Sequence, residues 1–107
     1  MKFMKRIKEN LWPGETGLAW YRREQWDRLR QVSEDADQLE ERYDEWLALA
    51  TKTLANLQAS GMRIVKVEVD VNELQAYCAA HGLPVNSKSR SSFVADKLRQ
   101  QDEKQTG

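Results

Sequence analysis

Cys78 and His81 carry the side chains best suited to catalysis or metal binding, and they are three positions apart. On a helix this spacing places them at neighbouring positions of one face, where a thiolate and an imidazole could form half of a zinc site or a nucleophile and base pair. The sequence offers no further cysteine or histidine to complete a zinc site. We therefore predict a buried Cys78 and a His81 that ends a helix, and we assign no catalytic residue, metal or cofactor. A small enzyme of unknown reaction is the alternative.

Cations near the C-terminus make a second candidate site. Lys88 and Arg90 lie among serines at the start of an expected helix, and Lys97 and Arg99 follow along it. Free N–H groups, hydroxyls and cations together could hold a phosphate or another anion. Solvated surface charge is the competing interpretation of the same residues. We name all four as candidate contacts for an anion or a partner.

The N-terminal residues 1–16 read as a basic arm followed by a loop. Four cations precede Trp12, and Pro13, Gly14 and Gly17 then interrupt regular structure. A tryptophan in such a loop either caps the core or contacts a partner, so Trp12 joins the candidate contacts. The arm and the C-terminal cations together suggest a nucleic-acid or anion-binding protein. The acidic residues between 34 and 41 would repel a duplex, so we do not favour nucleic acid.

Length and composition restrict the number of domains, the kinds of partner and the compartment. The chain has 107 residues, and its 17 lysines and arginines balance 17 aspartates and glutamates. One compact domain fits this length, and zero net charge gives no general attraction to nucleic acid or to an anionic membrane. A single cysteine suits a reducing compartment, and no apolar stretch approaches the roughly 20 residues that span a bilayer. We expect a cytoplasmic protein with no membrane span.

The segment 36–60 should be the longest helix, because its apolar residues recur at helical spacing. These residues are Leu39, Tyr43, Trp46, Leu47, Ala50, Leu54 and Leu57. We predict further helices over 22–33, 71–81 and 88–100, and a disordered tail over 101–107. Asp70 should cap the third of these four helices, and Gly61 should end the long one. Trp26, Tyr43 and Trp46 should form an aromatic core between the first two helices.

Two segments read as strands. Residues 64–69 alternate valine with charged residues, which is the pattern of a half-buried strand, and residues 18–21 form a shorter apolar run. A helical crossover between them favours parallel pairing. We predict a mainly helical α+β domain over 17–100, with the valine face of the sheet packed on the helix 36–60. The free edge of a two-stranded sheet could pair with a second copy to form a homodimer.

Several segments together resemble a group of short bacterial proteins of unknown function. They are Leu18-Ala19-Trp20-Tyr21, Tyr43-Asp44-Glu45-Trp46, Val67-Glu68-Val69-Asp70, Tyr77-Cys78, and Arg90 ahead of Phe93. The resemblance covers residues 17–97 and implies a shared fold, without an activity or a site. Aromatic richness and the lack of a catalytic motif favour a non-catalytic protein-interaction or accessory module with an unknown protein partner. The anion-binding protein and the small enzyme remain the alternatives.

Overall fold

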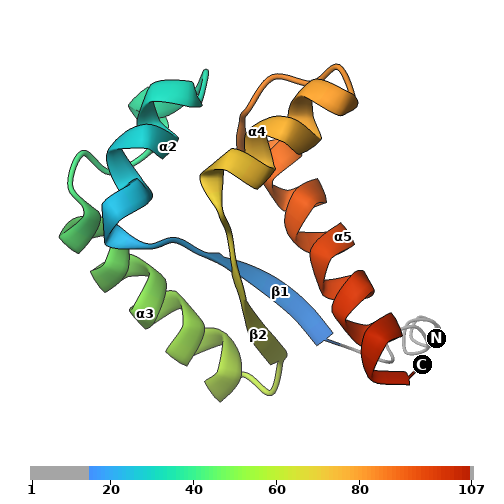
Figure 1. Ribbon diagram of the computed structural model, residues 1–107. Coiled ribbons are helices and arrows are strands. Elements are labelled where there is room, and N and C mark those ends of the chain that lie inside the picture. The colour runs from blue at the N-terminus through green and yellow to red at the C-terminus, as the bar shows by residue number, and fades with distance from the viewer. Residues whose placement is uncertain (1–14, 107) are drawn as a thin grey trace, which may run out of the picture.

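The computed structural model describes residues 15–106, which form a two-stranded sheet between helices (Figure 1). The basic arm and Trp12 lie outside the described residues. The mainly helical α+β class is confirmed. In chain order the elements are β1 (Glu15–Trp20), the 3₁₀ turn η1 (Arg23–Gln25), α2 (Trp26–Val32), the 3₁₀ turn η2 (Ala36–Gln38), α3 (Tyr43–Ala59), β2 (Arg63–Glu68), α4 (Val71–Ala80) and α5 (Ser87–Thr106).

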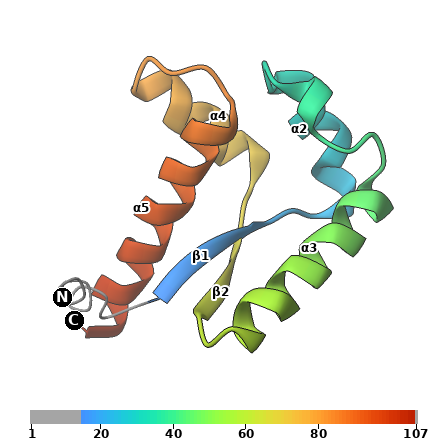
Figure 2. The same cartoon turned by 180° about the vertical axis from the view of Figure 1, so that it is seen from behind.

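The two strands run parallel, as predicted, with Gly17 opposite Val65 and Ala19 opposite Val67. The crossover through α2 and α3 makes this orientation possible. Helix α3 lies on one side of the strands and α5 on the other, which Figure 2 shows from behind. The sheet is therefore the middle of three layers, and each of its faces has a helix to bury it.

The valine face of β2 packs toward α5, so the prediction that it packs on the helix 36–60 is wrong. Val67 and Val69 belong to the same buried cluster as Val94 and Leu98 of α5 and Leu74 of α4. The other face of the sheet meets α3 through Trp20, whose ring lies edge-on to Trp46 at 5.3 Å between centroids. Valines suit this face because it is fully buried, with Val67 and Val69 at 0% and 1% exposed.

Helix α3 begins at Tyr43, later than the predicted start at residue 36. An aspartate can cap a helix, but the carboxylate of Asp35, just before the predicted start, accepts hydrogen bonds from Arg90 and from the Ser87 N–H. The indole of Trp26 also donates to the Glu40 carbonyl at 3.1 Å. These contacts hold the segment before α3 against α2 and α5. Tertiary bonds therefore take the groups that an earlier helix would have used.

The predicted helix ends are confirmed at Asp70 and Gly61. Asp70 Oδ1 accepts from the N–H of Asn72 at 2.8 Å and of Glu73 at 3.2 Å, which caps α4. Gly61 and Gly82 have φ of 95° and 65°, a left-handed conformation that favours glycine. At α3 the Met62 N–H returns to the Leu57 carbonyl at 3.2 Å, as in a Schellman motif.

Helix α5 continues to Thr106, past the predicted end at residue 100 and through the segment 101–106 for which the sequence suggests disorder. Gln, Glu and Lys dominate this segment and have good helix propensity, so the backbone continues a helix already begun at Ser87. The predicted first helix, 22–33, is divided between η1 and α2.

The predicted aromatic core is confirmed between α2 and α3. Trp26 is buried and lies 5.4 Å from Trp46 and 6.1 Å from Tyr43, measured between ring centroids. Tyr21 completes the cluster at the end of β1, at 5.3 Å from Trp46. Contacts of this kind stabilise a small core beyond the area they bury.

Candidate functional site

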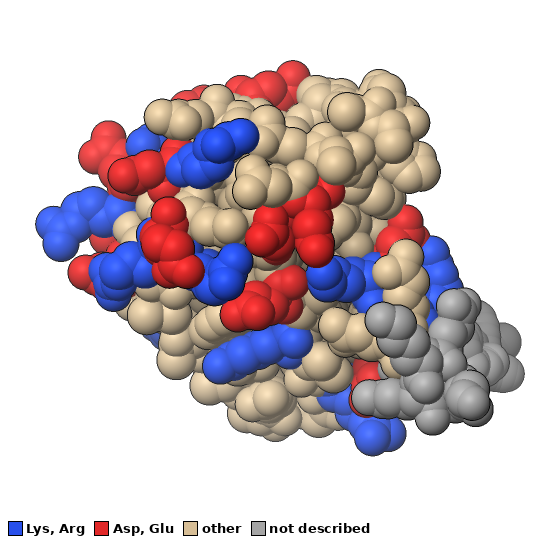
Figure 3. Space-filling model, in the orientation of Figure 1, with Lys and Arg blue, Asp and Glu red and all other residues tan. Residues whose placement is uncertain are grey.

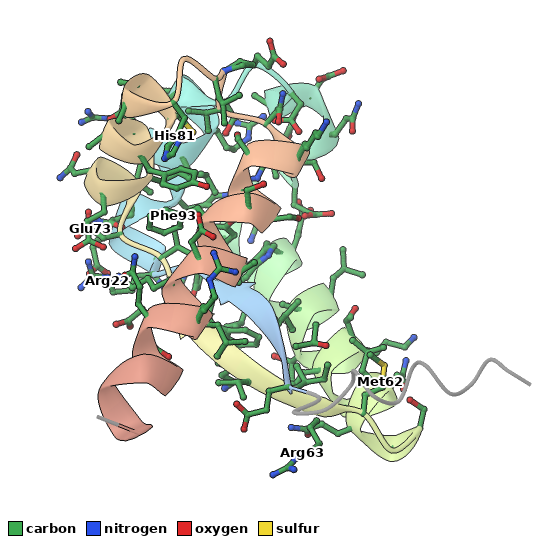
Figure 4. All side chains as sticks on the ribbon, turned by 90° about the vertical axis from the view of Figure 1, so that its right-hand side faces the viewer. Arg22, Met62, Arg63, Glu73, His81 and Phe93 are labelled. Atoms are coloured by element: carbon green, nitrogen blue, oxygen red, sulfur yellow. The ribbon has the colours of Figure 1, made fainter. Side chains whose placement is uncertain are left out.

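An open groove runs along the junction of β1 and α5, and we call it the β1–α5 groove. It has a volume of about 680 Å³, within the range of ligand pockets in proteins. In Figure 4 α5 crosses in front of the C-terminal end of β1. Its lining residues are Glu15, Thr16, Gly17, Leu18, Ala19 and Tyr21 from the strand side, and Ser87, Arg90, Ser91, Val94, Ala95, Leu98 and Arg99 from α5.

The strand side of the groove presents an unpaired sheet edge. The Trp20 carbonyl accepts from the Val69 N–H at 2.9 Å, so this carbonyl points toward β2. Because backbone groups of successive strand residues point in opposite directions, those of Gly17 and Ala19 point away from β2. Among residues 15–106 no third strand covers them. An unpaired row of N–H and C=O groups is a template for an added strand.

Gly17 sets how closely α5 approaches the strand. A Cβ atom at this position would lie 2.8 Å from Val94 Cγ1 and 3.0 Å from Val67 Cγ2, which is closer than carbon atoms pack. Leu98 lies on the same side, at 3.5 Å from such an atom. Helix α5 therefore packs over β1 with no side chain between them at Gly17. The apolar interior of the groove is made largely by small or aliphatic side chains.

A buried ion pair closes one end of the groove. Arg90 donates from both terminal nitrogens to the two carboxylate oxygens of Asp35, each at 2.9 Å, and one nitrogen also donates to Ser33 Oγ at 3.1 Å. Only 10% of the Arg90 side chain and 14% of the Asp35 side chain are exposed. Arg90 thus ties α5 to the segment between α2 and η2. A bidentate pair of this kind is among the stronger hydrogen-bonded contacts in proteins.

Two pKa values are shifted at this end of the groove. Hydrogen bonds from Arg90 lower the pKa of the Asp35 carboxyl. Burial raises the pKa of Tyr21 to about 12, and the positive charge of Arg90 opposes this rise. The phenol of Tyr21 therefore stays protonated at neutral pH, and Asp35 stays ionised. The closed end of the groove presents a neutral phenol beside a neutralised cation.

The structure does not gather the predicted cations into one anion site. Arg90 faces the groove and is paired with Asp35, whereas Lys97 donates to Glu73 at 2.7 Å on the α4 side of α5. Arg99 lines the groove and pairs with Asp96, and Lys88 is exposed near the start of the helix. Figure 3 shows lysines and arginines interleaved with acids on the face it presents. Three of the four candidate cations thus already have carboxylate partners.

Cys78 and His81 occupy different surroundings, as the sequence predicts. Cys78 is 2% exposed and belongs to the core cluster. His81 is exposed at the end of α4, where its ring packs at a tilt against Tyr77, with 4.4 Å between centroids. Figure 4 shows His81 and Phe93 along the contact between α4 and α5. A buried thiol is shielded from substrates, so these two residues do not form an accessible pair.

Sequence reasoning missed the groove and the role of Asp35. No local pattern marks a groove built from a glycine in one strand and a helix some 70 positions later, as Gly17 and residues 87–99 are. Gly17 carries the one available signal, since a glycine at the start of an apolar run can mark a close approach of two backbones. Beside Pro13 and Gly14, however, Gly17 is more readily interpreted as part of a loop.

No protein-family model, no curated protein and no solved structure matches this chain. The resemblance to short bacterial proteins therefore stays a prediction. Within residues 15–106, no helix is both long and apolar enough to cross a membrane. In the same range no three side chains of histidine, cysteine, aspartate or glutamate come together as a possible metal site.

Proposed function

We propose that this protein is a non-catalytic interaction module that binds an extended polypeptide segment in the β1–α5 groove. The observation that carries the proposal is the unpaired edge of β1, which borders the groove beside α5. A segment added there would satisfy the outward backbone groups of Gly17 and Ala19. Main-chain hydrogen bonds then provide affinity, and the side chains of the groove provide selectivity.

The apolar residues of the groove support a polypeptide as the ligand. Val94 and Leu98 are buried members of the core whose side chains also line the groove, and Ala95 is an exposed neighbour. An incoming strand would place alternate side chains under this part of α5 and the others toward the α3 side of the sheet. Small or aliphatic side chains fit the first set best.

A second copy of the chain is a poorer fit to this edge. Pairing two β1 strands about a two-fold axis would place them about 4.8 Å apart, with both α5 helices on the same face. Packed helices need axes roughly 8 to 10 Å apart, and α5 lies over β1 itself at Gly17. The two helices would therefore collide, so the segment that binds should carry no helix on that face. A homodimer, if it forms, should use another surface.

The cellular setting proposed for this module is the cytoplasm. The support is compositional, since the only cysteine is buried and free. Reduced thiols are the rule in that compartment.

Selection from a library of random displayed 12-residue peptides tests the interaction. The full chain is the bait, and selected peptides are then measured by calorimetry against two variants. Ala95→Trp fills the groove, and Ala48→Trp places the same side chain at an exposed position of α3. We expect Ala95→Trp to weaken binding by more than about tenfold, which is about 1.4 kcal/mol, and Ala48→Trp to leave it unchanged.

Amide exchange locates the bound peptide. Binding should slow exchange of the Gly17 and Ala19 N–H groups, because a strand added at this edge would accept hydrogen bonds from them. The proposal fails if no peptide is selected, or if the selected peptides bind wild type and Ala95→Trp equally well.

A further inference from the structure

We propose that residues 3–11 of this same chain bind in the β1–α5 groove and compete there with a partner segment. The inference rests on the proposed function, because it assigns a regulator to the same site. Its first support is continuity. The chain enters β1 at Glu15, which itself lines the groove, so residues 1–14 are attached to the body of the protein at that end of the groove.

The length and sequence of this segment match the groove. The six residues of β1 extend about 20 Å, and 12 residues can span roughly 40 Å at 3.3 Å per residue. Pro13 and Gly14 are the residues that favour the two central positions of a reversing turn. In an extended segment the odd positions share one face, and here they are Phe3, Lys5, Ile7, Glu9 and Leu11. The three apolar side chains suit the aliphatic side of α5, with the charged side chains of Lys5 and Glu9 between them.

Charge also favours this occupant. Residues 1–14 contain four cations and one acid, for a net charge of +3, which leaves 13 cations and 16 acids, or −3, on the remaining residues. Within the groove Arg90 and Arg99 are paired with Asp35 and Asp96, whereas no salt bridge is formed by Glu15 with residues 15–101. The groove therefore carries a small negative charge. A basic segment meets attraction there, and repulsion is confined to Glu9.

Attachment to β1 strengthens the competition. A short linker gives a tethered segment an effective concentration in the millimolar range. Even weak contacts would then keep the groove occupied in a large share of molecules. A partner would bind with an affinity reduced in proportion to the fraction of molecules whose groove is empty.

A spin label on the full chain tests the location of the segment. Ser92→Cys places the label on an exposed position next to Ser91 at the groove, and Leu49→Cys places it on α3, across the sheet. The native Cys78 is 2% exposed and should not react. We expect the label at position 92 to broaden the amide signals of residues 3–11 severalfold, and the label at position 49 to leave them sharp. Adding Ala95→Trp should restore the signals in the first case.

Three results would overturn the proposal. The first is equal broadening from both labels, and the second is no broadening from either. The third is broadening that appears only between an isotope-labelled and a spin-labelled molecule in a mixed sample, which would identify a second copy as the occupant.

A further variant separates this inference from the proposed function. Phe3→Asp with Ile7→Asp should release the segment and raise the affinity for selected peptides severalfold. Unchanged peptide affinity overturns competition by residues 3–11 and leaves peptide binding intact. A third outcome is also distinguishable. If the label at position 92 alone broadens the signals of residues 3–11 but no peptide is selected from the library, residues 3–11 occupy the groove and the interaction function is rejected.

Discussion

Arg90 and Asp35 join α5 to the segment between α2 and η2 through a bidentate ion pair, with both N···O distances at 2.9 Å. Arg90 comes from α5 and Asp35 from the segment that precedes α3, so 55 positions separate them. The pair also borders the β1–α5 groove, because Arg90 is one of the lining residues. The stability of the fold and the shape of the candidate site therefore depend on the same contact.

Removing one charge of this pair should be costly. Asp35→Asn leaves the Arg90 guanidinium nearly buried without a counter-charge, and such losses typically cost about 3 kcal/mol or more. Chemical denaturation of wild type and variant measures the change. Asp44→Asn is the matched control, because the Arg23–Asp44 pair is also short, at 2.7 Å, but its side chains are 63% and 58% exposed. We expect little change in the control, since water screens an exposed pair.

A second variant tests the reason for that loss. Asp35→Leu with Arg90→Met removes both charges and should recover much of the stability, because no uncompensated buried charge remains. Equal destabilisation by Asp35→Asn and Asp44→Asn would show that burial of the pair does not matter.

Acid should weaken the fold through the same pair. The Arg90 hydrogen bonds hold the pKa of the Asp35 carboxyl below its usual value, so folding favours the ionised form. Its contribution is present above the unfolded-state pKa, about 3.9, and is lost as pH falls through the lower folded-state pKa. Denaturation curves from neutral pH to pH 2 should therefore show the wild type approaching Asp35→Asn at the acid end. A constant difference between the two proteins would contradict the linkage.

Local patterns predicted the elements and their caps because these depend on near neighbours. Asp70 caps α4 through N–H groups two and three positions away, and Gly61 closes α3 within one turn. The start of α3 escaped prediction because its nearest candidate cap, Asp35, binds a residue 55 positions away. A polar side chain such as Asp35 can either cap a helix or bind a distant residue. It takes the role that the tertiary structure stabilises more, and a single sequence does not show which role that is.

The orientation of the sheet escaped prediction for a related reason. The alternation of residues 64–69 correctly indicates a strand with one apolar face. Two amphipathic partners compete for that face, since α3 and α5 both carry apolar residues. The apolar face of β2 packs against α5, because Gly17 lets α5 approach β1 closely. The periodicity of the sequence does not reveal this close approach.

Gly17→Ala should destabilise the protein although alanine is normally the better strand residue. Replacing a strand glycine by alanine gains roughly 0.5 to 1 kcal/mol, but overpacking a dense core costs typically about 1 to 3 kcal/mol. The new methyl would lie 2.8 Å from Val94 Cγ1, so the second effect should win. Thermal or chemical unfolding measures the outcome. Thr16→Val, at an exposed neighbouring position of the strand, should be nearly neutral.

Val94→Ala supplies the test of that mechanism. It removes the atom nearest to the new methyl, so Gly17→Ala should cost less in the Val94→Ala background than in wild type. A double-mutant cycle measures this coupling directly. Additive effects of the two substitutions would rule out a steric clash as the cause.

Tyr43→Phe should loosen the junction between β1 and α3. The Tyr43 hydroxyl donates to the Tyr21 carbonyl at 2.8 Å in a partly buried position, just after β1 ends. Losing the donor leaves that carbonyl unpaired, at a cost of about 1 kcal/mol, while the ring remains to pack on Trp26 and Trp46. Tyr77→Phe removes a hydroxyl of similar geometry, donated at 2.8 Å to Asp96, whose carboxylate is open to water. We expect a smaller loss of unfolding free energy there, because water replaces the lost donor at Asp96; a loss as large as that of Tyr43→Phe would mean that shielding of the Tyr21 carbonyl does not set the cost.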